Sequence, residues 1–287
     1  MKLLFLLVGS LLFSQSISHI KLSDQIYMIK GKGGNIGLFV GKNDLFMVDN
    51  QYADISTRLM EQIRTISDKP IKYIVNTHFH GDHTGGNENF GKKGAIFIAH
   101  ENVRKKLSVP HEVKFFGMTS DAKPQIALPK ITFSDRLTLY MDQEEIELIH
   151  LKNAHTDGDA IVYFKTSNVL HMGDLYFSGM YPFFDNGNGA NIKGIIYTLA
   201  NVLTMINEDT RIIPGHGKES NKKELFAYLE MIKTLVSSIE KEIALKKSLS
   251  DIQSLNLAKT FESSFGNGFL KSKDIVMLIY ENLIAFK

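Results

Sequence analysis

The sequence contains no cysteine among its 287 residues. This absence excludes disulfide bonds, a thiolate nucleophile and any zinc site with sulfur ligands. A bound metal would therefore have to be held by histidine, aspartate, glutamate or water. Chains without thiols occur in every redox compartment, so the absence does not indicate where the protein works.

An excess of charge of either sign is also missing, because the formal net charge is only +2. The overall balance thus shows no sign of a nucleic-acid or membrane-surface partner, and we expect a small-molecule substrate. The oligomeric state stays open. No internal repeat, low-complexity tract or linker rich in proline and glycine divides the chain. We therefore predict one domain over residues 17–287.

Long apolar runs are absent except near the N-terminus, where residues 3–13 form one such run behind Lys2. Small and polar residues follow this run, a pattern typical of a signal peptide. The run is too short to span a bilayer comfortably. We predict a signal peptide over residues 1–16, cleaved after Ser16 or alternatively Ser18, and an exported protein, periplasmic or secreted. The alternative is a buried N-terminal strand or helix.

Strand and helix patterns alternate in both halves of the chain, which favours a layered α/β fold. Short apolar runs predict strands at 26–29, 38–40, 45–49, 71–75, 95–99, 130–133, 136–140, 145–150, 160–165, 168–171 and 211–213. Helical spacing predicts helices at 54–66, 100–107, 192–206 and 270–284, and a helix whose apolar face runs from 225 to 243. That face is expected to pack on its own domain rather than on a partner.

The stretch at 108–129 lacks a clear period and holds three of the six prolines. We predict a long loop there. Loops of this length either act as functional lids or are plain surface excursions, and the sequence does not separate the two.

Histidine is concentrated in the segment T-H-F-H-G-D-H-T-G-G. His78 and His80 are two positions apart at the end of a predicted strand, so both imidazoles can reach one ion. Gly81 is expected to let the backbone turn sharply. Asp82 and His83 follow at once and can face a second point a few ångströms away. Imidazole and carboxylate ligands suit zinc, so the cluster predicts a metal site.

Further ligand candidates lie later in the chain, each near glycine at the end of a predicted strand: His155, Asp174 and His216. Loops at such strand ends often collect functional residues in α/β sheets. His171 either supports a ligand or packs at its strand end. The remaining histidines lack a comparable context: His19, His100, His111 and His150.

Four motifs together resemble the metallo-β-lactamase superfamily of zinc hydrolases. They read T-H-F-H-G-D-H-T-G-G, A-H-T-D-G-D, H-M-G-D and I-P-G-H-G, in the order and with the spacing found in that family. The stretches G-G-N-I-G and F-M-V-D-N near the N-terminus look like the family's opening strands. The resemblance covers about residues 24–220 and implies an αββα sandwich, here with extra C-terminal helices.

The resemblance also implies a ligand set for two zinc ions. It places His78, His80 and His155 on the first ion, Asp82, His83 and His216 on the second, and Asp174 between both. Asp174 matches the bridging aspartate of members similar to glyoxalase II and lactonases, where β-lactamases typically carry another residue. This match favours a hydrolase other than a dedicated β-lactamase. Ala154 replaces a glycine found in many members, and we expect no effect on the neighbouring ligand.

These features predict a dinuclear zinc-dependent hydrolase that uses a metal-bridging hydroxide on an ester, thioester, lactone or cyclic amide. Asp82 is expected to ligate metal, orient the hydroxide and carry its proton to the leaving group. One alternative is hydrolysis of β-lactam antibiotics. Another is a binding protein that keeps the fold but has lost the chemistry, and a third is a redox protein with iron at the same ligands.

Several other residues allow two interpretations each. Asp49, Thr84 and Asp159 either support ligand histidines or serve as turn and capping residues. Tyr176, Tyr181 and Asn186 either contact the substrate or simply pack. Substrate recognition is expected from the loops at 31–37, 104–129 and 176–192 together with the C-terminal helices.

Overall fold

The structure is a computed structural model that describes residues 16–286, so the predicted signal peptide lies outside it except for Ser16. Two mixed sheets form its centre. The first has the order β1 (Ser18–Lys21), β2 (Ile26–Lys30), β3 (Ile36–Val40), β4 (Leu45–Val48), β5 (Ile71–Asn76), β6 (Ile96–His100) and β9 (Ile131–Phe133). The second has the order β10 (Arg136–Met141), β11 (Glu144–His150), β12 (Ala160–Phe164), β13 (Val169–His171), β14 (Arg211–Ile213) and β15 (Ser220–Asn221).

Helices connect the strands and extend the chain at its C-terminal end. They are α1 (Ser56–Arg64), α2 (Gly81–Thr84), α3 (Asn87–Gly91), α4 (Glu101–Leu107), α5 (Ile192–Met205), α6 (Lys222–Ala244), α7 (Leu249–Ser254), α8 (Glu262–Phe265) and α9 (Ser272–Ala285). No helix within residues 16–286 is both long and apolar enough to cross a membrane.

The two sheets pack face to face around a shared apolar core. Phe164 of β12 contacts both Phe39 of β3 and Phe46 of β4, with ring centroids 6.2 and 5.9 Å apart. The outer face of the first sheet packs against Leu59 and Ile63 of α1. Because alternate strand residues point to opposite faces, each sheet has one face for the shared core and one for helices.

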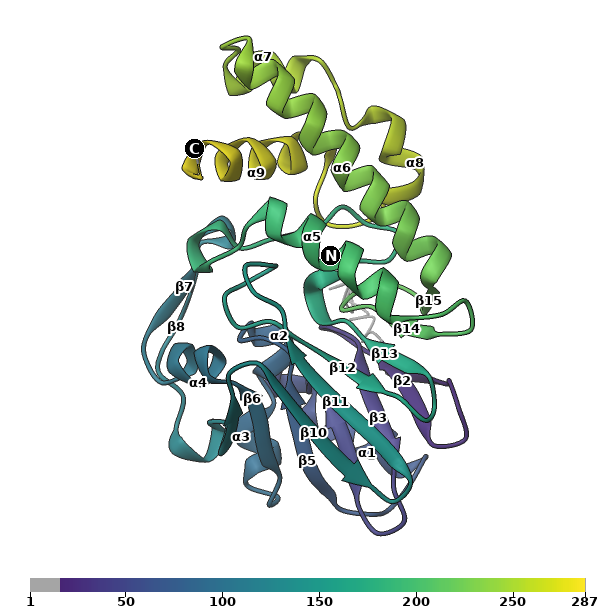
Figure 1. The fold of residues 1–287 in the computed structure, drawn as a ribbon. Helices are drawn as coiled ribbons and strands as arrows, with labels where there is room; N and C mark the ends of the chain where they lie inside the picture. The colour runs from purple at the N-terminus through teal and green to yellow at the C-terminus, as the bar shows by residue number, and fades with distance from the viewer. Residues whose placement is uncertain (1–15, 287) are drawn as a thin grey trace, which may run out of the picture.

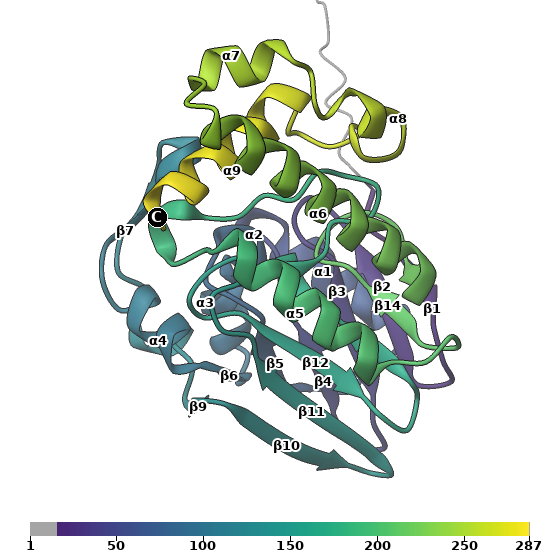
Figure 2. The ribbon, with the colours of Figure 1, turned by 45° about the horizontal axis from the view of Figure 1, so that its top comes forward.

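The outer face of the second sheet packs against α5, α6 and α9 in a second large core. Figure 2 shows α5 and α6 lying over this sheet, and Figure 1 shows α6–α9 gathered at one end of the molecule. The predicted apolar face of α6 is buried within its own chain, at Leu225, Leu229, Ile232, Val236, Ile239 and Ile243. The predicted αββα sandwich with extra C-terminal helices is confirmed.

The segment 108–129 differs from the predicted loop. It contains the hairpin of β7 (His111–Val113) and β8 (Met118–Ser120), with a short 3₁₀ turn between them. The turn ends at Gly117, which has a φ of 60° and closes the hairpin in the left-handed region that glycine adopts readily. Strands of three residues are too short to show an alternating pattern, which is why the sequence did not reveal them.

Parallel pairing brings several loops to one edge of each sheet. In the first sheet β4 and β5 run parallel, so Asp49 and Thr77 follow neighbouring strand ends. In the second sheet β13 and β14 run parallel, so the loops that carry Asp174 and His216 also lie together. Loops at the carboxyl ends of parallel strands are common locations for functional sites.

Candidate metal centre

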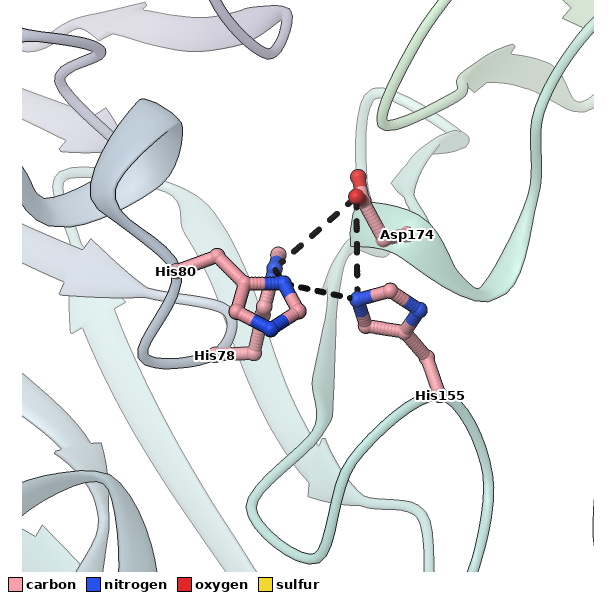
Figure 3. A group of neighbouring side chains, drawn as sticks. All are labelled: His78, His80, His155 and Asp174. Carbon is pink, nitrogen blue, oxygen red and sulfur yellow. Dashed lines mark hydrogen bonds and ion pairs between the residues drawn. The ribbon is translucent and has the colours of Figure 1, made fainter. Parts of the chain in front are cut away.

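A first group of donor atoms forms where the loop after β5 meets two loops of the second sheet. His78, His80, His155 and Asp174 offer ligand atoms that lie within 4.8 Å of one another, and all four residues are buried. The Nδ1 atom of His80 is 3.0 Å from Nε2 of His78 and 3.0 Å from Nε2 of His155. Figure 3 shows the three imidazoles and the carboxylate pointing toward a common centre.

The outer nitrogen of each imidazole has an acceptor that fixes its proton. His80 Nε2 lies 3.0 Å from Oδ2 of Asp185, and His155 Nδ1 lies 2.9 Å from the carbonyl oxygen of Phe183. In a neutral imidazole the proton goes to the nitrogen that faces an acceptor, which leaves a lone pair on the other one. The inner nitrogens of His80 and His155 therefore present lone pairs to each other.

His78 follows the same rule through a hydroxyl relay. The Thr77 hydroxyl donates to Asp49 Oδ2 at 2.7 Å, so its oxygen is free to accept from His78 Nδ1 at 3.1 Å. The Nε2 atom of His78 then also carries a lone pair. Three lone pairs meeting at about hydrogen-bond distance repel one another unless a cation lies between them.

A second group forms beside the first from Asp82, His83 and His216, whose ligand atoms also lie within 4.8 Å of one another. The Nε2 atom of His216 is 3.2 Å from Asp82 Oδ2 and 3.4 Å from His83 Nε2. The outer nitrogen of His83 lies 2.7 Å from Oδ2 of Asp49, which turns the inner nitrogen toward the group. The His216 ring stacks on Phe177, with an interplanar angle of 7°.

Asp174 lies between the two groups. Its Oδ2 is 3.7 Å from His155 Nε2 and 3.3 Å from His216 Nε2, so one oxygen faces both groups. Its Oδ1 is buried 3.1 Å from His83 Nε2, so this oxygen has a hydrogen-bond donor only while that nitrogen carries a proton. A buried carboxylate oxygen without a donor is costly, and a cation beside it would remove that cost.

The electrostatics differ between the groups. Burial lowers the pKa of His155 to about 4, so this imidazole is neutral at pH 7. Burial would also lower the pKa of His216, but the carboxylates of Asp174 and Asp82 raise it to about 9. Burial opposes ionisation of Asp82, yet His83 and His216 hold the pKa of this carboxyl well below its usual range. Without metal, His216 therefore holds a proton at pH 7 that His155 does not hold.

The structure brings together all seven residues that the sequence singled out, and their role as metal ligands stays a prediction. Asp49 supports His83 and Thr77, while Asp159 accepts from the backbone N–H and hydroxyl of Thr156, next to His155. Thr84 donates to the carbonyl of His80. Three others pack inside the protein, as the second interpretation expected: Tyr176, Tyr181 and Asn186. Their polar groups form hydrogen bonds with Ser220, Ala258 and Leu278, respectively.

Two features of the site were missed or misread from the sequence. Asp185, which fixes His80, had no motif to mark it, because it lies 105 positions away in the chain. The chain turns into α2 at Gly81 as expected, but the turn does not require glycine. The φ of Gly81 is not in the left-handed region, and a Cβ there would meet nothing within 4 Å. Gly81 begins α2 with ordinary backbone, and its missing side chain leaves the space beside Asp82 open.

A pocket of about 380 Å³ opens onto both groups. His80, Asp82, Asp174 and His216 form its floor, and residues from several distant parts of the chain form its walls. Tyr52 stands at the wall, where burial and the nearby Asp82 raise its pKa to about 12. Its hydroxyl therefore keeps its proton at neutral pH and can donate a hydrogen bond.

Comparison with known proteins identifies the family. The model of the metallo-beta-lactamase superfamily matches residues 29–217, which includes all seven donor residues. The chain belongs to this superfamily. Together with the two groups of His and Asp donors, this membership makes the protein a zinc metallohydrolase.

The curated relatives carry different names. A 2,4-dinitroanisole O-demethylase subunit alpha from Nocardioides sp. is 26% identical over 57% of this chain, which spans only 45% of that protein. A metallo-beta-lactamase type 2 from Bacteroides fragilis is 22% identical over 72% of this chain and 82% of its own. A probable hydroxyacylglutathione hydrolase from Schizosaccharomyces pombe is 28% identical over 69% of this chain and 70% of its own.

Among solved structures, the sec-alkylsulfatase Pisa1 from Pseudomonas sp. superposes with a TM-score of 0.73 at 15% identity. The superposition covers 94% of this chain and 51% of the sulfatase. At such low identity the similarity shows the fold alone. It extends beyond the sandwich, because 94% of the chain cannot be reached without the C-terminal helices.

Proposed function

We propose that the chain is a dinuclear zinc hydrolase that cleaves an ester, thioester, lactone or cyclic amide. The observation that carries this proposal is the convergence of seven nitrogen and oxygen donors in two adjoining groups joined by Asp174. His78, His80 and His155 would hold one ion and Asp82, His83 and His216 the other.

The donor set fits zinc. Neutral imidazoles and carboxylates are ligands that zinc accepts. Each ion would have three ligands of its own and would share Asp174, and zinc can expand to five ligands to take water or substrate. The acceptors of the outer histidine nitrogens also support a metal site, because ligating histidines commonly donate their other N–H to a carboxylate or carbonyl. Asp185, Asp49 and the Phe183 carbonyl fill these places here.

When bound, zinc supplies hydroxide at neutral pH and a Lewis acid for the carbonyl oxygen. Asp82 lies on the pocket floor and is ionised, so its carboxylate can orient the attacking water and accept its proton. The same carboxyl can then pass the proton to the leaving group. The Tyr52 hydroxyl at the wall can donate to an oxygen of the substrate.

The test is a hydrolysis panel with zinc-loaded residues 17–287. The panel contains p-nitrophenyl esters, thioesters, lactones and the β-lactam nitrocefin, each with and without a chelator. Chelator-sensitive turnover of at least one ester, thioester or lactone supports the proposal. Turnover of nitrocefin alone would assign the chain to β-lactam hydrolysis instead. Rates no greater than those of free zinc on every substrate would refute both.

Replacing Asp185 by asparagine is expected to weaken zinc binding at the first group by about 10–100-fold. The amide no longer offers a carboxylate to His80 Nε2, so the ring loses both its fixed tautomer and its orientation. Competition with a chromophoric chelator measures the affinity. Asp209→Asn, on an exposed loop, is the matched control and should bind zinc as the parent does. Equal affinities for both variants would show that Asp185 has no positioning role.

Zinc binding at the second group is expected to release about two protons at pH 7, whereas His78 and His155 of the first group have none to release, because burial lowers the pKa of both. The pKa of His216 is about 9 and that of His83 lies well above its usual range, so both hold a proton at pH 7 without metal. A ligand must lose its proton before it binds, so affinity at this group falls as pH falls. Calorimetry in buffers of different ionisation enthalpy counts the protons, and equal release from both groups would contradict the assignment.

We further propose that residues 1–16 are removed as a signal peptide and that residues 17–287 act outside the cytoplasm as one domain. The apolar run behind Lys2 supports the first point. The single domain is supported by the apolar core that α5, α6 and α9 share with the second sheet. The intact mass of the protein recovered from its producing cells should begin at Ile17, and a mass that includes residues 1–16 would contradict export by this route.

A further inference from the structure

The walls of the pocket above the donor groups are apolar and aromatic. Beyond the floor, they consist mainly of Val113, Phe116 and Met118 from the β7–β8 hairpin, Phe177 and Phe183 from the loop after β13, and Phe269. The aromatic rings contact one another across these segments. Phe116 is 4.9 Å from Phe183 and 5.6 Å from Phe269, measured between ring centroids.

The outermost of these side chains are exposed. Phe116, Met118 and Phe269 leave 43%, 50% and 49% of their surface open to solvent, while Phe177 and Phe183 are buried beneath them. Both ribbon views show the hairpin reaching toward α9, so the rim joins two segments more than 140 positions apart in the sequence (Figures 1 and 2). Exposing three large apolar side chains to water at the mouth of a polar site is unfavourable. Covering them with an apolar group would lower the free energy.

Charge that could bind an ionic substrate is scarce in the same pocket. Among the described residues that line it, Lys32 is the only lysine or arginine. Its Nζ atom is 2.5 Å from Oδ2 of Asp54 and lies over the Tyr52 ring, 5.2 Å from its centroid. Among the described lining residues, Lys32 is thus already paired and no guanidinium is present to bind a distant carboxylate, sulfate or phosphate of the substrate.

We propose that the enzyme selects uncharged carbonyl substrates with a large alkyl or aryl group beside the scissile bond. This inference rests on the proposed hydrolase function and adds its substrate class. The apolar group would lie between Phe116, Met118 and Phe269, with the reacting carbonyl at the floor. A thioester of a charged peptide-like thiol would find no partner for its carboxylates in this pocket.

Two ester series test the proposal on the zinc-loaded protein. In one, the acyl chain of a p-nitrophenyl ester grows from acetate through butanoate and hexanoate to octanoate. In the other, the alcohol chain of an acetate ester grows in the same steps. We expect kcat/KM to rise about fourfold per methylene in at least one series. A hexanoate ester that carries a terminal carboxylate should react at least tenfold more slowly than plain hexanoate.

Variants connect the chain-length effect to the rim. Phe116→Ala and Phe269→Ala should each lower the ratio of octanoate to acetate turnover at least tenfold. Phe226→Ala is the matched control, because Phe226 is an exposed phenylalanine of α6 that does not line the pocket. Its ratio should equal that of the parent.

The outcomes separate this inference from the proposed function. Chelator-sensitive turnover that is flat with chain length in both series, or equal turnover of the carboxylate-bearing ester, would overturn the substrate class and leave the hydrolase standing. If no ester, thioester or lactone is turned over, the proposed function fails. Calorimetry of the uncharged amides butanamide, hexanamide and octanamide on the zinc-loaded protein then tests whether the pocket binds an apolar group. A dissociation constant that falls about fourfold per methylene supports the apolar site, and a constant value contradicts it.

Discussion

Replacing Asp82 by asparagine lowers kcat/KM for zinc-dependent hydrolysis by about 10²–10⁴-fold. Asparagine keeps the shape of the side chain but removes the charge that faces His216 Nε2 at 3.2 Å. It also removes the proton acceptor from the pocket floor, and a positioned acid–base group contributes a rate factor of this size. Steady-state kinetics on the best ester of the panel, with zinc content measured on the same sample, checks the effect.

Asp68→Asn provides the control for this substitution. Asp68 is exposed and precedes β5, at the opposite end of that strand from the donor residues, so the variant makes the same chemical change without touching the site. It should retain the parent's rate and zinc content. If Asp82→Asn also kept two zinc ions and the parent's rate, Asp82 would be neither a ligand nor the proton carrier.

Replacing Gly215 by alanine is expected to abolish zinc binding at the second group and to destabilise the fold by about 1–3 kcal/mol. The new Cβ would lie 2.0 Å from Oδ1 of Asp174 and 2.6 Å from the carbonyl oxygen of Gly173. The backbone of Gly173 cannot yield easily, so the Asp174 carboxylate must move from its place between the groups. Thermal unfolding of the metal-free protein and zinc analysis measure the two effects separately.

Gly81→Ala is the matched control for this glycine substitution. Gly81 stands among the predicted ligands, but a Cβ there meets no atom within 4 Å. The variant should keep the parent's melting temperature and zinc content, whatever happens to substrate binding. A melting temperature and zinc content for Gly215→Ala equal to those of Gly81→Ala would show that Asp174 does not need its observed position.

Local sequence was sufficient to predict the first half of the site. His78 and His80 lie on one side because alternate residues at a strand end do so, and their density marked the cluster. Assigning His155 and His216 to separate ions needed the family resemblance. His155 lies 75 positions from His80 and His216 lies 133 positions from His83, so each pair meets only through the sandwich, and no local pattern encodes that meeting.

The residues that shape substrate choice were harder to predict. The expected loops do line the pocket, but the hairpin at 111–120 consists of two three-residue strands without a readable period. Phe269 reaches the rim from a segment between α8 and α9, and aromatic residues in such segments are usually packing residues. Gly81 shows the opposite error. We expected glycine to be needed for the sharp turn at Gly81, whereas the close backbone approach that requires glycine occurs at Gly215.

Native mass spectrometry of zinc-loaded residues 17–287 tests the central claim most directly. The account predicts two zinc ions per chain. It further predicts that His155→Ala and His216→Ala each lose one ion, while the exposed-site variant Asp68→Asn keeps both. A parent that binds a single ion, carries iron instead, or keeps two ions in both histidine variants would contradict the account of two adjoining zinc sites.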